Sequence, residues 1–278
     1  MPELPEVETI RRDLIKQVLG KEIQSVEVLL DRVYLNPDKL EVKGIIENIS
    51  RIGKYLSVDV KDCCTLFVHL RMTGKLVYIK IPPTPLYKGG SSDGFTKSEN
   101  HIRVIFNFKT NDCLLFQDIR TFGLIEVVPY KSQLVSIKNI GIDAISPEFT
   151  EEYLNKLCSG KTCPIKMLLL DQTKIAGIGN IYAQEILFYA GVSPLRVVNS
   201  LKDFEIGKIW RFTKEILELA LKHNGTSISD FRRVDDKKGE FQDFLKVYGK
   251  KVCPVCGKEL LKIKQGGRST SYCGDCQI

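Results

Sequence analysis

The hydrophobic residues of this chain change their spacing at about residue 150, so the two parts of the chain must fold differently. Before that point apolar and polar residues alternate, as in strands with one buried face, most plainly at Ile102, Val104, Phe106 and Phe108. This pattern predicts a β-sandwich preceded by a helix. The segments with the alternation are 23–30, 55–60, 66–70, 75–79, 102–108, 113–117 and 123–128.

After about residue 150 apolar residues recur every three or four positions, which is typical of amphipathic helices. The predicted helices span 151–157, 164–170, 180–190 and 204–222. The fold class that follows is α+β with two domains. We predict a sandwich over 1–130, a linker over 131–150, a helical domain over 151–246 and a small cysteine-containing module over 247–278.

That last module carries two CxxC pairs, Cys253 with Cys256 and Cys273 with Cys276, separated by sixteen residues. This spacing is typical of a tetrahedral Cys₄ zinc site, and four protein ligands leave no open position for water. One structural zinc ion is therefore predicted. The remaining cysteines show no chelating pattern and are interpreted as small hydrophobic residues, namely Cys63, Cys64, Cys113, Cys158 and Cys163.

The opening MPELPEVE allows two interpretations. Removal of Met1 would leave the secondary amine of Pro2 at the tip, and an α-amino group titrates at roughly pH 7.7–8. Such an amine can attack an electrophilic carbon, and the resulting iminium favours elimination of a β leaving group. The alternative is a plain helix start with acidic residues in its first turn, followed by an apolar stripe of Val7, Ile10, Leu14 and Val18.

The net charge of +7 is concentrated near the C-terminus, because residues 246–272 carry seven basic side chains and one acidic one. This clustering favours a polyanionic partner. The sequence contains no apolar run of about 18 residues and its acidic start does not resemble a secretion signal. Nine cysteines in an uneven pattern do not suggest a disulfide framework. A cytoplasmic protein that does not cross a membrane is expected.

Two motifs lack the context that their chemistry requires. Gly90–Gly94 matches G-x-S-x-G but lies in a Pro- and Gly-rich stretch, 82–100, predicted to be a long surface loop of unassigned role. Gly177-Ile-Gly179 begins like a dinucleotide fingerprint, but Tyr182 occupies the third glycine position. The turn could instead hold a phosphate on free N–H groups at a helix start, or serve as an ordinary cap.

Four features together resemble the formamidopyrimidine-DNA glycosylases: the MPELPEVE opening, the strand-rich half, the AGIGNIY turn and the terminal CxxC…GRSTSYCxxCQ. The resemblance covers nearly the whole chain. It implies a bifunctional glycosylase and abasic-site lyase of base excision repair that removes oxidised purines, chiefly 8-oxoguanine and formamidopyrimidines. Its catalytic set maps onto Pro2 as nucleophile, Glu3 as acid/base, and Lys54 and Arg268 as groups that grip phosphates.

The same resemblance implies a DNA-binding set. His69 and Asn180 contact phosphates, Lys166 lies near the active site, and Met72, Arg120 and Phe122 fill the space left by an extruded base. Core positions for Met72 and Phe122, and a helix-surface position for Lys166, are the structural alternatives. The implied partner is damaged double-stranded DNA, bound by a monomer with no small-molecule cofactor.

Two other functions stay open. An endonuclease VIII-like preference for oxidised pyrimidines would use the same amine, whereas a zinc-ribbon protein would bind DNA without chemistry. The segment 225–242 resembles the family's base-closing loop but has Asp236 and Lys238 where Gly and Pro are frequent, so the resemblance leaves the preferred base open.

Overall fold

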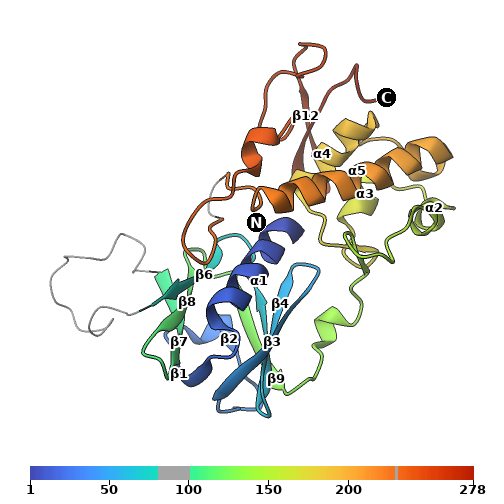
Figure 1. The fold of residues 1–278 in the computed structure, drawn as a ribbon. Coiled ribbons are helices and arrows are strands. Elements are labelled where there is room, and N and C mark those ends of the chain that lie inside the picture. Colours follow the sequence, from blue (N-terminus) through green and yellow to red (C-terminus); the bar gives the residue numbers. More distant parts are fainter. Residues whose placement is uncertain (81–100, 229–230) are drawn as a thin grey trace. The chain divides into compact units, whose positions relative to one another are not determined.

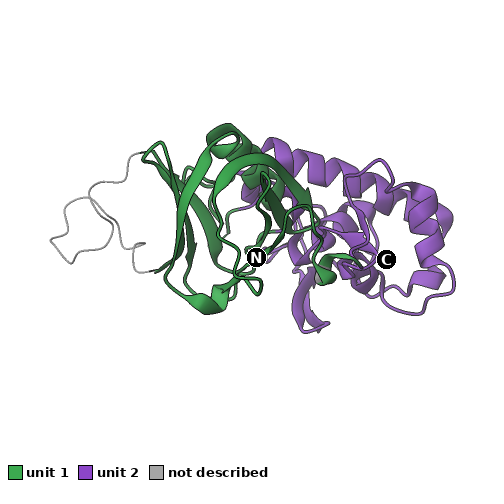
Figure 2. Cartoon of the chain, turned by 90° about the horizontal axis from the view of Figure 1, so that it is seen from below, with its two compact units in different colours: residues 1–2, 6–138, 227–239 green, residues 3–5, 139–226, 240–278 purple. Residues whose placement is uncertain are grey.

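The computed structural model describes residues 1–80, 101–228 and 231–278, so the predicted 82–100 loop lies outside the described residues. The chain divides into two compact units (Figure 2). Unit 1 comprises residues 1–2, 6–138 and 227–239, and unit 2 comprises residues 3–5, 139–226 and 240–278.

The described part of unit 1 consists of helix α1 (Leu4–Val18, of which residues from Glu6 onward belong to this unit) and nine strands in one hydrogen-bonded order, β2-β9-β5-β4-β3-β1-β7-β8-β6 (Figure 1). The strands are β1 (Glu22–Val28), β2 (Tyr34–Leu35), β3 (Gly44–Ile52), β4 (Tyr55–Val60), β5 (Cys64–His69), β6 (Gly74–Ile79), β7 (Ile102–Phe108), β8 (Cys113–Asp118) and β9 (Leu124–Pro129). Short 3₁₀ turns occur at Asp31–Val33 and Val135–Ile137.

Both halves of this sheet contribute to one core, which confirms the predicted sandwich with its leading helix. Apolar side chains of β3, β4 and β5 share a cluster with those of β7 and β8, and the stripe of α1 packs into the same cluster. Each predicted strand is found within a few residues of its expected bounds. Strand β3 was not predicted, because a bulge between Ile46 and Asn48 places its buried residues Ile46 and Ile49 three positions apart and removes the alternation.

Residues 227–239 pack with unit 1 although they follow the last long helix in the sequence. Phe231 and Val234 are buried in the sandwich core, and the Arg233 guanidinium donates to both carboxylate oxygens of Asp13 at 3.0 Å. The packing therefore differs from the predicted helical domain 151–246 at this segment. Asp236 has a φ of +60°, a left-handed conformation that favours glycine, which accounts for the frequent Gly at this position.

Unit 2 is built from helices α2 (Glu151–Cys158), α3 (Ile165–Leu170), α4 (Asn180–Ala190) and α5 (Asp203–Lys222), all within about one residue of prediction. Its short strands are β10 (Ile142–Asp143), β11 (Ile175–Ala176), β12 (Leu261–Gln265) and β13 (Arg268–Tyr272), and 3₁₀ turns lie at Val198–Ser200 and Phe241–Phe244. Strands β12 and β13 form an antiparallel hairpin. Over the part of the chain that the structure describes, none of the helices has the length and apolar character needed to span a membrane.

Glu8 couples α1 to β3, because its carboxylate accepts hydrogen bonds from Arg11 and Arg12 on the helix and from Arg51 on the strand. Burial alone would raise the pKa of this carboxyl, but the guanidinium groups prevail and lower it from 4.5 to about 2. Because the pKa of Glu8 is lower in the folded chain than in the unfolded chain, its ionised carboxylate stabilises the fold at pH values above 4.5. This stabilisation is lost as the pH falls toward 2.

We predict that Glu8→Gln lowers the free energy of unfolding by roughly 2 kcal/mol at pH 7 and by clearly less at pH 3. Urea unfolding of the wild type and the variant at both pH values measures the difference. An equal loss at the two pH values would show that ionisation of Glu8 contributes nothing.

Candidate active site and zinc centre

The carboxylate of Glu3 caps the amino end of α4. Glu3 is 3% exposed, and its Oε1 and Oε2 accept the N–H groups of Ile181 at 2.9 Å and Tyr182 at 3.3 Å. The first N–H groups of a helix have no partner within the helix, and the dipole favours an anion there. Of the two alternatives for this turn, the phosphate site on free N–H groups is therefore wrong for Ile181 and Tyr182, where Glu3 supplies a cap.

The glycines of the AGIGN turn make room for the N-terminal residues. A Cβ on Gly179 would lie 2.2 Å from Cδ of Glu3, and a Cβ on Gly177 would lie 2.4 Å from Cδ1 of Leu4. Gly177 also has a φ of +100°, and its carbonyl accepts the Leu4 N–H at 3.0 Å. The turn thus holds residues 3 and 4 by direct contact.

Pro2 directly precedes the Glu3 cap, so the chain tip is tethered within one residue of α4. Pro2 is buried, whereas Met1 is 37% exposed. Helix α1 starts at Leu4 and buries the predicted apolar stripe, so the helix-start interpretation of the opening is confirmed, while the nucleophile at Pro2 stays a prediction. The two interpretations are compatible, because residue 2 lies before the first helical residue.

Lys166, Asn180 and the β12–β13 hairpin form one polar cluster in unit 2. The fully buried Lys166 Nζ donates to Oδ1 of Asn180 at 2.7 Å and to Oγ1 of Thr270 at 2.6 Å. Burial and the nearby charge of Arg268 lower the pKa of Lys166 to about 8, against the opposing effect of Glu3. The helix-surface alternative for Lys166 is thus wrong, while its DNA contact stays a prediction. Arg268 itself is exposed on β13.

In unit 1, Lys54 and His69 lie close together at neighbouring strand ends. Lys54 occupies the turn between β3 and β4, and His69 ends β5 and pairs with Tyr55, against which its ring packs edge-on at 4.5 Å. Burial, followed by the charges of Arg71 and Lys54, lowers the pKa of His69 to about 3, so the ring is neutral at pH 7. Its Nδ1 accepts the Arg71 N–H at 3.0 Å, which assigns the proton to Nε2 and makes that atom a hydrogen-bond donor.

Met72, Arg120 and Phe122 project from two adjacent turns of unit 1. Met72 is 41% exposed and Phe122 is 56% exposed, so the alternative that they are core residues is wrong. The Arg120 guanidinium lies 5.0 Å from the centre of the Phe122 ring. An exposed apolar and planar group of this kind is suited to entering a base stack.

Asp118, which the sequence interpretation missed, joins these two turns. It is fully buried, accepts the Gly123 N–H at 2.7 Å and also bonds the Thr73 hydroxyl, while Thr73 Oγ1 accepts the Arg120 N–H at 3.0 Å. The only sequence signal was its place at the start of DIRTFG. A fully buried carboxylate with backbone partners orders both turns at once.

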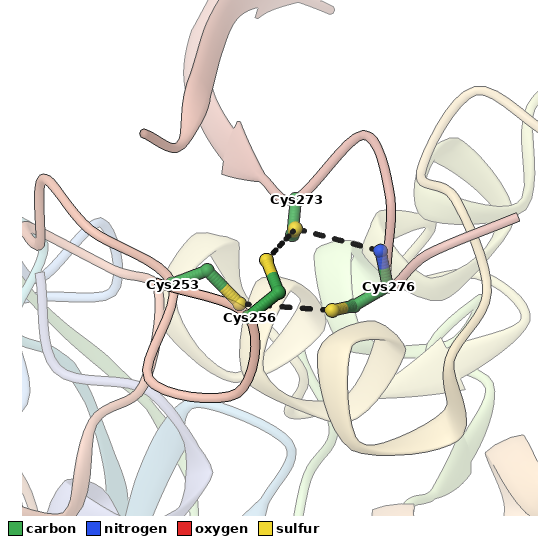
Figure 3. Close-up of side chains that lie close together, drawn as sticks. All are labelled: Cys253, Cys256, Cys273 and Cys276. Atoms are coloured by element: carbon green, nitrogen blue, oxygen red, sulfur yellow. Dashed lines mark hydrogen bonds between the residues drawn. The ribbon is translucent and has the colours of Figure 1, made fainter. Parts of the chain in front are cut away.

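The four predicted zinc ligands meet in unit 2 (Figure 3). Their sulfur atoms all lie within 4.8 Å of one another, with Cys253 and Cys276 at 3.8 Å and Cys256 and Cys273 at 3.5 Å. A zinc ion with Zn–S bonds of about 2.3 Å has S–S edges of about 3.8 Å, so the cluster has the right size. Four thiolates fill the tetrahedron, which makes the site structural.

Comparison with known proteins agrees with this geometry. The chain matches the formamidopyrimidine-DNA glycosylase N-terminal domain over residues 1–125, the formamidopyrimidine-DNA glycosylase H2TH domain over 140–232 and the zinc finger found in FPG and IleRS over 250–278. A formamidopyrimidine-DNA glycosylase of Pelotomaculum thermopropionicum is 41% identical over 286 residues, which cover 100% of this chain and 99% of that protein.

Solved structures resemble the chain over nearly its full length. A Lactococcus lactis FPG mutant in complex with a Fapy-dG-containing DNA gives a TM-score of 0.85 at 34% identity, covering 99% of each chain. MutM in complex with carbocyclic 8-oxo-G-containing DNA gives 0.83 at 35% identity, again covering 99% of each chain. The chain belongs to the formamidopyrimidine-DNA glycosylase family.

Removal of zinc should unfold the C-terminal module, because its few apolar residues form a small cluster around Cys253 and Cys273. We predict one zinc per chain, and a loss of both metal and DNA binding in Cys273→Ser. Cys163→Ser, which alters a cysteine outside the cluster, is the matched control and should keep both. Elemental analysis and binding titrations measure these outcomes, and normal DNA binding by zinc-free protein would contradict them.

A side chain at residue 179 should displace the Glu3 cap. We predict that Gly179→Ala reduces single-turnover cleavage of abasic-site DNA by about 10²-fold, because a shift of about 1 Å in a reacting group can have this effect. Gly207→Ala is the control, since its Cβ would meet only the mobile end of Glu151 and alanine suits a helix. Equal rates for Gly179→Ala and wild type would mean that the cap does not position the reactive group.

Proposed function

We propose that this chain is a bifunctional DNA glycosylase and abasic-site lyase that removes oxidised purines, 8-oxoguanine and formamidopyrimidines, from duplex DNA in base excision repair. The observation that carries the proposal is the Glu3 carboxylate fixed on α4 next to Pro2. The Fapy-dG and 8-oxo-G in the DNA of the two related complexes support the choice of substrate.

In the proposed mechanism, loss of Met1 exposes the imino nitrogen of Pro2, which attacks C1′ of the damaged nucleotide. The base leaves as its glycosidic bond breaks, and the sugar opens to a cationic iminium on Pro2. Glu3 helps to open the ring and transfers protons. Loss of a C2′ proton expels the 3′ phosphate, and a second elimination expels the 5′ phosphate. Water then hydrolyses the iminium, which releases the unsaturated sugar remnant and frees the Pro2 nitrogen. The product is a one-nucleotide gap flanked by phosphates, and zinc has no part in these steps.

Phosphate contacts are proposed for Lys54, His69, Asn180 and Arg268. The neutral Nε2–H of His69 supports a hydrogen-bonding role for it rather than an ionic one. Of these four residues only Lys54 and Arg268 are charged, so together they should contribute roughly −2 to the slope of log K against log salt.

Extrusion of the damaged base leaves a gap in the base stack. Leaving this gap empty costs a few kcal/mol of free energy. We propose that Met72 and Phe122 enter this gap, and that the planar guanidinium of Arg120 pairs with the orphaned cytosine. Their exposure on adjacent turns supports this assignment. The proposed set also includes Lys166, whose buried ammonium contacts Asn180.

A monomer acting in the cytoplasm is proposed. None of the nine cysteines is in a disulfide, which is usual for proteins of a reducing compartment, and a DNA substrate is consistent with that location.

An N-terminal extension should block the chemistry, because it converts the imino group of Pro2 into an amide. We predict a loss of at least about 10³-fold in cleavage of 8-oxoguanine duplexes, with binding changed by less than about threefold. The same tag placed at the C-terminus is the control. Full activity with the N-terminal tag retained would remove Pro2 from the mechanism.

Single-turnover rates on duplexes that contain 8-oxoguanine, formamidopyrimidine or an oxidised pyrimidine test the substrate class. We expect the two purine lesions to be cut faster. Faster cutting of the pyrimidine would favour the endonuclease VIII-like alternative, and DNA binding without any cutting would favour the zinc-ribbon alternative.

A further inference from the structure

Strand β13 has two edges, and side chains of α4 bind the one that β12 leaves open. Strand β12 pairs with β13 in register from Leu261 with Tyr272 to Gln265 with Arg268. On β13, the Ser269 carbonyl accepts Nδ2 of Asn180 at 3.1 Å, and the Ser271 N–H donates to Oε1 of Gln184 at 2.6 Å. A buried strand edge without such partners would leave polar backbone groups unsatisfied.

The Gln184 carboxamide acts here like the peptide group of a neighbouring strand. Its Oε1 accepts the Ser271 N–H, while its Nε2 approaches the Ser269 carbonyl at 3.4 Å and donates to the Asn180 carbonyl at 2.6 Å. The C=O of one residue and the N–H of the second residue after it point to the same side of a strand. One amide therefore fixes the register of three consecutive residues of β13. Because Gln184 is only 3% exposed, water has little access to replace its hydrogen bonds if the side chain is removed.

Arg268 lies immediately before this segment and immediately after the two-glycine turn of the hairpin. Gly266 and Gly267 have φ values of +55° and +75°, so the turn that precedes Arg268 is built from the residues with the most conformational freedom. Arg268 pairs with Gln265 of β12, and restraint on the opposite edge of β13 comes from the residues that follow Arg268. The α4 contacts to residues 269–271 supply that restraint.

We propose that Gln184 is a positioning residue for Arg268, holding β13 against α4 so that the guanidinium is presented to a DNA phosphate. This inference rests on the proposed phosphate contact of Arg268. Asn180 shares the contact with β13, but it is itself a proposed phosphate ligand, so the test substitutes Gln184, which bonds Asn180 only at its backbone carbonyl. No part of the family resemblance depends on Gln184.

The test compares Gln184→Ala, Arg268→Ala and the double variant by binding to a duplex with a stable abasic-site analogue over a series of salt concentrations. Arg268→Ala should make the slope of log K against log salt less negative by about 1. Gln184→Ala should produce at least about half of that change. The double variant should bind no more weakly than Arg268→Ala, because both substitutions remove the same contact, the one between Arg268 and a phosphate.

Gln277→Ala is the matched control for a general loss of stability. Gln277 is also a buried amide, but its side chain bonds the Cys273 N–H and the Val192 carbonyl, which lie outside residues 268–271. Its substitution should lower the melting temperature and leave the salt slope unchanged, with zinc content measured in every variant. If Gln184→Ala does not fold, Gln184→Glu keeps the acceptor for Ser271, loses the donor, and should give an intermediate slope.

The outcomes separate the two claims. A wild-type slope for Gln184→Ala, together with multiplicative losses in the double variant, overturns the positioning role while the phosphate contact stands. A wild-type slope for Arg268→Ala overturns both. A slope changed equally by Gln277→Ala would mean that Gln184 acts only through stability, which also overturns the inference.

Discussion

The hydrogen bonds from the first turn of α4 to the Glu3 carboxylate fix the N-terminal end of the chain, and the proposed active site depends on them. A buried N–H group without a partner costs about 1–3 kcal/mol, so Ile181 and Tyr182 need an acceptor, and the chain supplies one from its third residue. Two glycines are required because side chains at 177 and 179 would occupy the space of Leu4 and Glu3. Because residues 3 and 4 are fixed on this turn, the N-terminal end of the chain is held in place. A nucleophile at residue 2 requires such a fixed position.

The same physical device recurs wherever a functional segment has to be held. A buried polar side chain binds backbone groups of a turn or strand edge and thereby fixes residues that project from it. Asp118 does this for the turns that carry Met72 and Phe122, and Gln184 does it for β13. Glu185 accepts the N–H groups of Lys246, Val247 and Tyr248 at 2.7, 3.0 and 2.8 Å, just before the first zinc ligand. Burial raises the pKa of Glu185 against the effect of these three donors.

Much of the fold could be predicted because periodicity survives in most elements. The change of spacing near residue 150 separates strands from helices correctly, and the CxxC spacing predicts the cysteine cluster. Strand β3 could not be predicted, because its bulge breaks the alternation, and the return of residues 227–239 to the sandwich depends on Phe231 and Val234 finding a distant core. Long-range packing of this kind leaves no local signal.

For the candidate site, motifs supplied residue identities but not the partners that position them. Asp118 and Gln184 were missed because buried polar residues on regular elements look like ordinary surface positions in a sequence. The choice between a phosphate site and a cap at the start of α4 could not be made from the sequence, because the acceptor for the Ile181 N–H lies 178 residues away in the chain. The surface alternative for Lys166 was wrong although a local signal existed, because its apolar neighbours in PIKMLLLDQ are typical of a buried helix.

The most direct test is to locate the covalent bond. The protein is trapped on an abasic-site duplex with borohydride, digested and sequenced by tandem mass spectrometry. If Pro2 is the nucleophile, the reduced sugar adduct is found on the nitrogen of Pro2 in chains that lack Met1. An adduct on a lysine side chain, such as Lys54 or Lys166, in a protein that cleaves at the normal rate would contradict it.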